Sequence, residues 1–352
     1  MSKSVLRIAI TVDPEIPVPP VYYGGIERIV DMLIGELQRR GHEVHLFANH
    51  LSSITVNLAP YPSSSSLSKR DTLKNAGYVW SYIQHNGPFD VIHSFARLAY
   101  LLPLIPTSLP KIQSYQRSIS PRSVRLGTAL AGRSLTFTSC SASNAAPVRN
   151  LSRNWSIVYN GIDTKKYSFA NRVEEDAPLI FLGRIERIKG VHTAIEVARR
   201  TGRRLLIAGN HATQGEEALY FEREILPQCD DEQIVFIGAV DDKQKNELLG
   251  RAAALLFPIE WQEPFGIVMI EALACGTPVI AFRRGSVPEV VTHGLTGFVC
   301  DTLEDMINAV KQIGDINRAI CRQKVIELFS ETSITDQYEE LYYSIIATKI
   351  GR

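Results

Sequence analysis

Short apolar runs alternate along the chain with stretches in which apolar residues recur every three or four positions. The run from Leu6 to Val12 predicts a buried strand, and the apolar positions between Ile26 and Leu37 predict a helix that ends at Gly41. Strands that alternate with helices favour parallel sheets covered on both faces, so the pattern predicts an α/β protein with doubly wound, Rossmann-like sheets. Further strands are predicted at "EVHLFA", "FDVIHSF", "LTFTSCS", "PLIFLG", "RLLIAG", "QIVFIG", "ALLFP", "PVIAF" and "GFVC".

The length of the chain is sufficient for two such sheets. It has 352 residues and 45% hydrophobic content, enough for two separate cores. The segment "YNGID" (159–163) contains an Asn-Gly turn, and a polar stretch separates it from the next apolar run. We therefore predict an N-terminal domain over residues 1–160 and a second domain over residues 161–330.

Charge is distributed unevenly between the two halves. Residues 1–162 carry 16 Lys and Arg against 8 Asp and Glu, whereas residues 163–352 carry 22 against 29. Residues 91–162 contain no acidic side chain, which suggests an anionic partner or an anionic surface such as a membrane. No nucleic-acid partner is expected. The alternative is a solvated face whose counter-charges lie on the other domain. The cations of this basic run are Arg97, Lys111, Arg117, Arg122, Arg125, Arg133, Arg149 and Arg153.

The cysteines and the apolar runs indicate the cellular compartment in which the protein is expected. The five cysteines are odd in number and form no C-x-x-C pair, which favours a reducing compartment over a disulfide scaffold or a zinc site. The N-terminal segment is expected to be a strand and not a signal peptide, and no apolar run reaches transmembrane length. We expect a cytoplasmic protein, with a peripheral contact at the inner face of the membrane through the basic run.

A phosphate site is predicted after the first strand of the second half. "GRIERIKG" (183–190) places Arg184 and Lys189 beside a helix expected to begin near Gly190, where free backbone N–H groups favour an anion. A diphosphate could be neutralised there without a metal, in keeping with the lack of a D-x-D pair. The alternative is a solvated basic helix start. In "RRGSVPE", Gly285 and Ser286 could also bring backbone N–H groups to an anion.

Two carboxylates lie beside this site in "EPFGIVMIEA" (263–272). Pro264 and Gly266 mark a loop, so Glu263 belongs to the loop and Glu271 to an early turn of the following helix. The alternative is a surface acid plus a capping or solvated helix acid. The chain contains neither G-x-x-x-x-G-K-[ST] nor G-x-G-x-x-G, which argues against a P-loop enzyme and a dinucleotide dehydrogenase.

Together these segments resemble the family-four retaining glycosyltransferases of the GT-B type. The resemblance is carried by "GGIER", "GRIERIKG", "EPFGIVMIEA" with its E-x7-E spacing, "ACGTPVIAF" and "VPEVVTHGLTGFV". It implies two facing Rossmann-like domains with a deep interdomain cleft. The nucleotide-sugar donor would bind the C-terminal domain and the acceptor the N-terminal one. It also implies a C-terminal helix, within residues 331–352, that crosses back to the first domain.

The resemblance also implies a role for each motif residue. Glu271 would bind the ribose hydroxyls and Glu263 the hexose, and Arg184 and Lys189 would stabilise the departing diphosphate. The base would lie near residues 237–240. Backbone groups of Phe265 and Gly266 would approach the sugar. The remaining expected donor-binding residues are Gly25, Gly183, Val240, Ile267 and Ser286.

The N-terminal half departs from the family pattern. His93 matches the first of two histidines often found in the family, but the second position is Phe95. Gln116 stands where the family usually has a histidine near the sugar, and glutamine cannot take a proton at neutral pH. His93 and Gln116 are nevertheless the expected catalytic residues of this half. The alternative for His93, a lone histidine on an apolar strand, is a hydrogen-bonded core residue.

The expected function is a metal-independent, retaining transfer of a hexose from a nucleotide-diphosphate sugar, most simply a UDP-sugar. The acceptor would be a glycan or glycolipid in envelope or exopolysaccharide synthesis. One alternative is a weakly active or inactive nucleotide-sugar-binding protein, which the residues at positions 95 and 116 favour. A second is a sugar-nucleotide epimerase of related fold, which "GRIERIKG" and "EPFG" disfavour.

Overall fold

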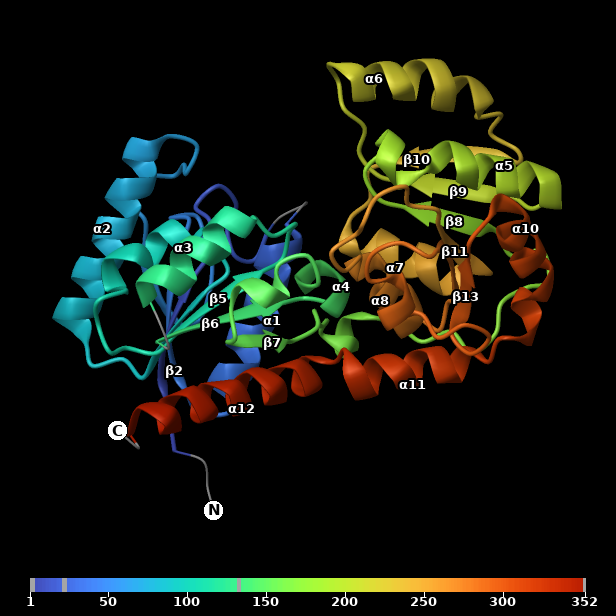
Figure 1. Cartoon of the computed structure of the whole chain (residues 1–352). Coiled ribbons are helices and arrows are strands. Elements are labelled where there is room, and N and C mark those ends of the chain that lie inside the picture. The colour runs from blue at the N-terminus through green and yellow to red at the C-terminus, as the bar shows by residue number, and fades with distance from the viewer. Residues whose placement is uncertain (1–3, 21–23, 132–133, 351–352) are drawn as a thin grey trace. The chain divides into compact units, whose positions relative to one another are not determined.

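The computed structural model describes residues 4–20, 24–131 and 134–350, and the chain divides into two compact units (Figure 1). Unit 1 comprises Met1–Ile162 together with Glu331–Arg352, and unit 2 comprises Asp163–Ser330. The boundary therefore falls two residues after the predicted one. The last segment of the chain belongs to the same unit as the first.

Unit 1 is built on a seven-stranded parallel sheet of order β3-β2-β1-β4-β5-β6-β7. The chain reverses its direction of travel across the sheet between β1 and β4, which makes that pair the topological switch point where such sheets bind ligands. The strands are β1 (Arg7–Thr11), β2 (Glu43–Ala48), β3 (Asn57–Pro60), β4 (Val91–Ser94), β5 (Lys111–Tyr115), β6 (Leu135–Ser139) and β7 (Trp155–Ile157). The α-helices of its first part are α1 (Gly25–Arg39), α2 (Lys69–Asn86), α3 (Pro121–Ala131) and α4 (Ala142–Ala145).

Unit 2 contains a six-stranded parallel sheet of order β10-β9-β8-β11-β12-β13, with its switch point between β8 and β11. The two doubly wound sheets predicted from the apolar pattern are thus confirmed. The strands are β8 (Leu179–Leu182), β9 (Leu205–Ala208), β10 (Ile234–Gly238), β11 (Ala254–Phe257), β12 (Val279–Phe282) and β13 (Gly297–Cys300). The helices are α5 (Val191–Thr201), α6 (Glu216–Tyr220), α7 (Asp242–Arg251), α8 (Ile267–Ala274), α9 (Val287–Val290), α10 (Leu303–Gln312) and α11 (Arg318–Leu328).

Three strands lie outside the predicted apolar runs. β3 and β7 are short edge strands, and only their inner sides pair with the sheet. β5 is central but polar in sequence, because it buries Lys111 and Gln113. The Lys111 ammonium donates to the carbonyl oxygens of Thr107 and Leu109 at 2.8 and 2.7 Å. The Gln113 amide donates to the Ala96 carbonyl at 2.8 Å, so hydrogen bonds replace the apolar contacts that usually mark a buried strand.

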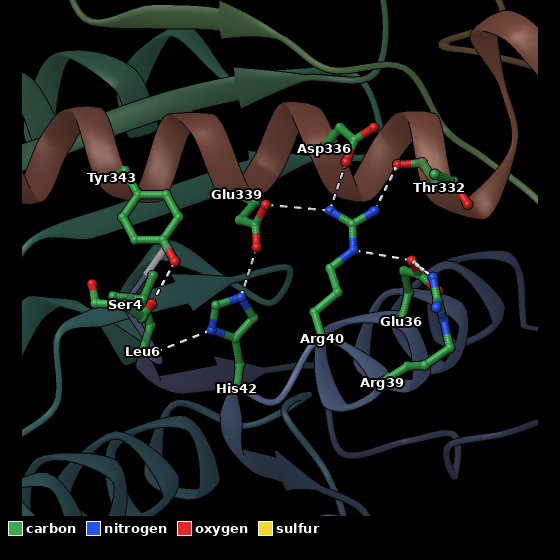
Figure 2. Close-up of polar contacts among 10 residues, drawn as sticks. All are labelled: Ser4, Leu6, Glu36, Arg39, Arg40, His42, Thr332, Asp336, Glu339 and Tyr343. Atoms are coloured by element: carbon green, nitrogen blue, oxygen red, sulfur yellow. Dashed lines mark hydrogen bonds and ion pairs between the residues drawn. The ribbon is translucent and has the colours of Figure 1, made fainter. Parts of the chain in front are cut away.

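The last helix, α12 (Glu331–Ile350), packs against α1 and completes unit 1 (Figure 1). Figure 2 shows Glu339 of α12 between His42 and Arg40. The Glu339 carboxylate lies 2.9 Å from His42 Nε2 and 3.3 Å from Arg40 Nη1. The Leu6 N–H donates to His42 Nδ1 at 3.0 Å, so Nε2 carries the ring proton and donates it to Glu339. A buried network therefore fastens α12 to the start of β1 and the end of α1.

Candidate functional site

The candidate site of unit 2 lies at its switch point, where the loops after β8 and β11 meet. Gly190 brings the two loops together, since a Cβ at this position would lie 2.0 Å from the Pro258 carbonyl oxygen. Its φ of 75° is also in the left-handed region that favours glycine. Helix α5 begins directly after it at Val191. The helix start predicted near Gly190 is therefore confirmed, and its N-terminus faces the same loops as the pair described next.

Lys189 and Glu263 form an ion pair across these loops. Their Nζ and Oε2 atoms are 2.6 Å apart, and the two side chains are only 15% and 12% exposed. Trp261 Nε1 donates to the same oxygen at 2.8 Å, and Lys189 Nζ lies 5.0 Å from the centre of the Trp261 ring. The two motifs that suggested an anion site and a sugar site are thus in direct contact. Arg184, half-exposed in the same loop, pairs with Glu186.

Glu271 occupies the first turns of α8 and is 8% exposed. Its Oε1 accepts hydrogen bonds from Tyr167 Oη at 2.7 Å and Lys245 Nζ at 2.5 Å. The helix begins at Ile267 after Gly266, whose φ is 74° and where a Cβ would lie 3.0 Å from the Phe257 ring. The Phe265 side chain is buried against Phe329, with ring centres 5.9 Å apart. The loop is therefore anchored directly after Glu263.

The segment at Gly285 and Ser286 supports this loop. The Gly285 N–H donates to Gln262 Oε1 at 2.7 Å, and the Ser286 N–H donates to the Glu263 carbonyl at 3.1 Å. The Ser286 hydroxyl donates to the Phe265 carbonyl at 2.7 Å. This corrects the prediction that both N–H groups approach an anion, because they are already committed to the "EPFG" loop. Ser286 is buried and acts on the site through that loop.

The remaining residues expected in unit 2 lie near the carboxyl ends of its strands. Gly183 follows β8, and its carbonyl lies against Gly209, where a Cβ would be 1.8 Å away. Val240 follows β10 and lines a small hollow of about 160 Å³ with Ile237, Gln244 and Leu248. A flat, partly apolar group could rest there. Within the described residues, no group of three or more His, Cys, Asp or Glu side chains is placed to hold a metal ion.

In unit 1, the structure places His93 in the core. The ring is fully buried, Nδ1 lies 2.7 Å from Tyr342 Oη, and Nε2 lies 2.6 Å from Ser114 Oγ. Burial lowers the pKa of His93 to about 3, so the ring stays neutral at physiological pH. Phe95 and Tyr338 pack on its faces, with ring centres 4.1 and 4.8 Å away. The expectation of a catalytic histidine is thus corrected in favour of a hydrogen-bonded core residue beneath α12.

Gln116 and Gly25 lie at the carboxyl edge of the unit 1 sheet. Gln116 directly follows β5, and its Oε1 is buried without a donor among the described residues. Gly25 is the first residue of α1, which follows β1. Gln116 therefore keeps an acceptor atom for a hydroxyl group, whereas Gly25 offers only backbone.

An acidic cluster at the same edge was not predicted. Asp13, just after β1, lies 3.6 Å from Arg97 Nε and 3.5 Å from Arg117 Nη2. Burial raises the pKa of Asp13 despite the two arginines, and burial likewise raises the pKa of Glu27. The only sequence signal was the acidic "DPE" directly after the first strand. These carboxyl groups lie beside the β1/β4 switch point of unit 1 and could accept hydrogen bonds from a sugar.

The basic run of unit 1 is only partly a surface feature. Lys111 is buried inside the sheet, which corrects its place on a basic face, and Arg133 lies outside the described residues. Arg122 and Arg125 are exposed on α3, next to Leu126 and Leu130, which are 47% and 55% exposed. Helix α3 thus combines positive charge with apolar surface. No helix in the described part of the chain is long and apolar enough to span a membrane.

Two family models match most of the chain. "Glycosyltransferase Family 4" matches residues 23–166, and "Glycosyl transferases group 1" matches residues 163–322. N-acetyl-alpha-D-glucosaminyl L-malate synthase of Bacillus anthracis is 29% identical over 210 residues, which are 54% of this chain and 53% of the relative. The chain thus spans about half the length of this curated relative.

Solved structures share the fold over nearly the whole chain. AviGT4, a glycosyltransferase involved in avilamycin A biosynthesis, has a TM-score of 0.75 at 23% identity, covering 97% of this chain and 98% of its own. HepE from Anabaena, solved in complex with UDP and glucose, has a TM-score of 0.73 at 18% identity, covering 96% and 100%. At these identities the likeness establishes the fold alone.

Proposed function

Because the chain belongs to the family-four glycosyltransferases of the GT-B type, we propose that it transfers a hexose from a UDP-sugar, with retention and without a metal. The acceptor in this proposal is a glycan or glycolipid of envelope or exopolysaccharide synthesis. Unit 2 binds the donor and unit 1 the acceptor. HepE, a structural neighbour solved with UDP and glucose, supports the choice of donor.

The observation that carries this proposal is the contact between the Lys189 and Glu263 side chains at the switch point of unit 2. A cation beside a carboxylate suits a ligand in which a phosphate is joined to a sugar. The ammonium would meet the diphosphate, and the carboxylate would accept hydroxyl protons. The N-terminus of α5 adds backbone N–H groups on the phosphate side. Arg184 supplies a second cation from the same loop.

The reaction breaks the bond between the anomeric carbon and the diphosphate oxygen and joins that carbon to the acceptor oxygen. The acceptor proton passes to the leaving diphosphate on the same face of the sugar, which gives retention. Lys189 and Arg184 stabilise the negative charge that grows on the diphosphate. No side chain has to exchange a proton, which agrees with a buried neutral His93 and a glutamine at position 116.

The second candidate is a nucleotide-sugar-binding protein without transfer activity. It is favoured by the same two positions, since neither His93 nor Gln116 can act as a general base here. Binding to UDP-, GDP-, ADP- and dTDP-sugars, measured by thermal shift, identifies the donor. The release of nucleotide with formation of a glycoside then distinguishes a transferase, and the anomeric proton coupling of the product reports retention. Binding without a product would establish the second candidate.

Metal independence is tested in the same assay. We expect EDTA to leave the transfer rate unchanged, because cationic side chains and the α5 N-terminus would neutralise the diphosphate. Loss of transfer in EDTA with recovery in magnesium would refute this part of the proposal.

Gln116 is expected to orient an acceptor hydroxyl through its buried Oε1. Gln116→Ala should lower kcat/KM by at most about tenfold, the value of one neutral hydrogen bond, without lowering stability. Gln116→His should keep the activity or raise it modestly. A gain of about 100-fold in Gln116→His, with a new pH dependence near ~6.5, would show instead that this position must exchange a proton. Identical kinetics for Gln116→Ala and the wild type would remove the residue from the site.

We further propose that α3 places unit 1 on an anionic membrane surface. Its exposed Arg122 and Arg125 would meet lipid phosphates, and the neighbouring Leu126 and Leu130 would enter the interface. Each arginine near such a surface contributes about 1 kcal/mol, so Arg122→Ser with Arg125→Ser should weaken vesicle binding roughly thirtyfold.

Sedimentation with vesicles that contain phosphatidylglycerol measures this effect, and high salt should mimic the variant. The matched control is Arg149→Ser with Arg153→Ser, which removes the same charge from exposed positions outside α3. Equal losses in both double variants would indicate general electrostatics, and no binding at low salt would refute the membrane contact.

A further inference from the structure

Glu263 is held by two donors that converge on one of its oxygens. Lys189 Nζ and Trp261 Nε1 both bond Oε2, at 2.6 and 2.8 Å. The ammonium also lies over the Trp261 ring, 5.0 Å from its centre. No described residue donates to the second oxygen, Oε1, which is not among the buried atoms without a partner. One oxygen is therefore fixed and the other remains accessible.

Glu271 repeats this construction with residues from other segments. Lys245 Nζ, on α7, and Tyr167 Oη, before β8, both bond Oε1, at 2.5 and 2.7 Å. Lys245 Nζ lies 5.8 Å from the centre of the Tyr167 ring, so the lysine again contacts both the carboxylate and an aromatic face. Across the described residues, no donor is bonded to Glu271 Oε2.

The shared construction has a physical consequence. A largely buried carboxylate requires a counter-charge, and a lysine alone holds it loosely because its ammonium rotates on a flexible stem. An aromatic ring restricts the ammonium by a cation–π contact and donates its own hydrogen bond to the carboxylate. Each carboxylate oxygen has lone pairs for about two hydrogen bonds, so two donors fill one oxygen. Ligand hydroxyls are then directed to the other.

We propose that Trp261, Lys245 and Tyr167 are positioning residues, which fix one oxygen of each glutamate so that the other accepts a hydroxyl of the nucleotide-sugar. Trp261 orients Glu263 toward the hexose, and Lys245 with Tyr167 orients Glu271 toward the ribose. This inference rests on the proposed function, because it assigns the two hydroxyl-bearing parts of the donor to the two glutamates. We call Trp261 with Lys189 the Glu263 clamp, and Lys245 with Tyr167 the Glu271 clamp. The two clamps can be tested separately, because UDP contains the ribose but lacks the hexose.

Calorimetry with two probes, UDP and UDP-glucose, separates the clamps. Tyr167→Phe keeps the ring and removes the hydroxyl, and it should lower the affinity for UDP about threefold to tenfold. Lys245→Met should lower the affinity for UDP about tenfold or more, and Lys245→Arg should restore part of it. Trp261→Phe should leave UDP affinity within about twofold. It should instead reduce the advantage of UDP-glucose over UDP, and lower kcat/KM for transfer, about threefold to tenfold.

A double-mutant cycle distinguishes positioning from a general structural role. If Tyr167 acts only through Glu271, Tyr167→Phe should have no further effect on UDP affinity in a Glu271→Ala background. Tyr82→Phe is the matched control, because it also removes one tyrosine hydroxyl, which here lies 3.0 Å from His45 Nδ1 in unit 1. It should leave the affinities for both probes unchanged.

The outcomes separate this inference from the proposed function. If the wild type binds UDP-glucose and makes a product, but the variants bind both probes as the wild type does, the positioning roles are wrong. Additive losses in the double-mutant cycle would also overturn them. If the wild type binds neither probe nor any other nucleotide-sugar in the screen, the proposed function fails first. Losses confined to the expected probe for each variant would establish both clamps.

Discussion

Lys189→Ala is expected to lower kcat about 100- to 1,000-fold, the usual loss when one preorganised group that stabilises transition-state charge is removed. Two effects add at this position. The diphosphate loses a nearby cation as its charge grows, and Glu263 loses the counter-charge that lies 2.6 Å from its Oε2. A carboxylate 12% exposed then keeps only Trp261 as a described donor, so its side chain should also move.

Steady-state kinetics with the donor identified in the screen measures this loss, and thermal unfolding checks that unit 2 is intact. Arg187→Ala is the matched control, since Arg187 belongs to the same loop but is half-exposed and pairs with Glu224. Because an exposed ion pair contributes little, that variant should change kcat less than about twofold. A Lys189→Ala enzyme with kcat within threefold of the wild type would exclude Lys189 from transition-state stabilisation.

Glu339→Ala is expected to destabilise unit 1 by about 1–3 kcal/mol, the usual cost of leaving a buried donor without its acceptor. The substitution removes one acceptor of the half-buried Arg40 guanidinium and the acceptor of the buried His42 N–H (Figure 2). Arg40 keeps Glu36 and Asp336, whereas His42 loses the partner of its only N–H. Detachment of α12 would in turn uncover Tyr338 and Tyr342, which pack around His93.

Urea unfolding followed by tryptophan fluorescence tests this prediction. In a Trp261→Phe background the signal comes from Trp80 and Trp155, the two remaining tryptophans, which both lie in unit 1. Glu340→Ala, an exposed position on the same helix, is the control and should change stability by less than about 0.5 kcal/mol. Equal unfolding midpoints for Glu339→Ala and the control would mean that the network on α12 contributes no net stability.

The apolar pattern predicted the strands that bury apolar side chains on both faces, and it missed the strand that does not. β5 fills central positions with Lys111 and Gln113, whose polar groups are bonded to carbonyls of neighbouring loops. These bonds go to backbone carbonyls, two residues away for Lys111 and 17 residues away for Gln113, and an apolar pattern reports neither. β3 and β7 were missed for a different reason, because short edge strands carry little pattern at all.

The candidate site was predictable where one motif contains the relevant residue, and not where distant segments meet. Glu263 and Lys189 each stand in a recognisable loop. Tyr167, by contrast, lies 104 residues from Glu271, and nothing in the sequence around it signals a shared hydrogen bond. The core role of His93 depends in the same way on Tyr342, 249 residues away. Tertiary contacts of this range decide which polar residues are structural and which are accessible to ligand.

The discontinuity of unit 1 has a consequence for the order of events during synthesis. The ribosome completes Asp163–Ser330, the whole of unit 2, before it supplies any residue of α12. Until then His42 and Arg40 lack Glu339, and the ring of His93 lacks the tyrosines that cover it. The nascent chain should therefore carry a folded second unit while the first still exposes apolar surface to chaperones, and unit 1 can close only after α12 itself has been synthesised.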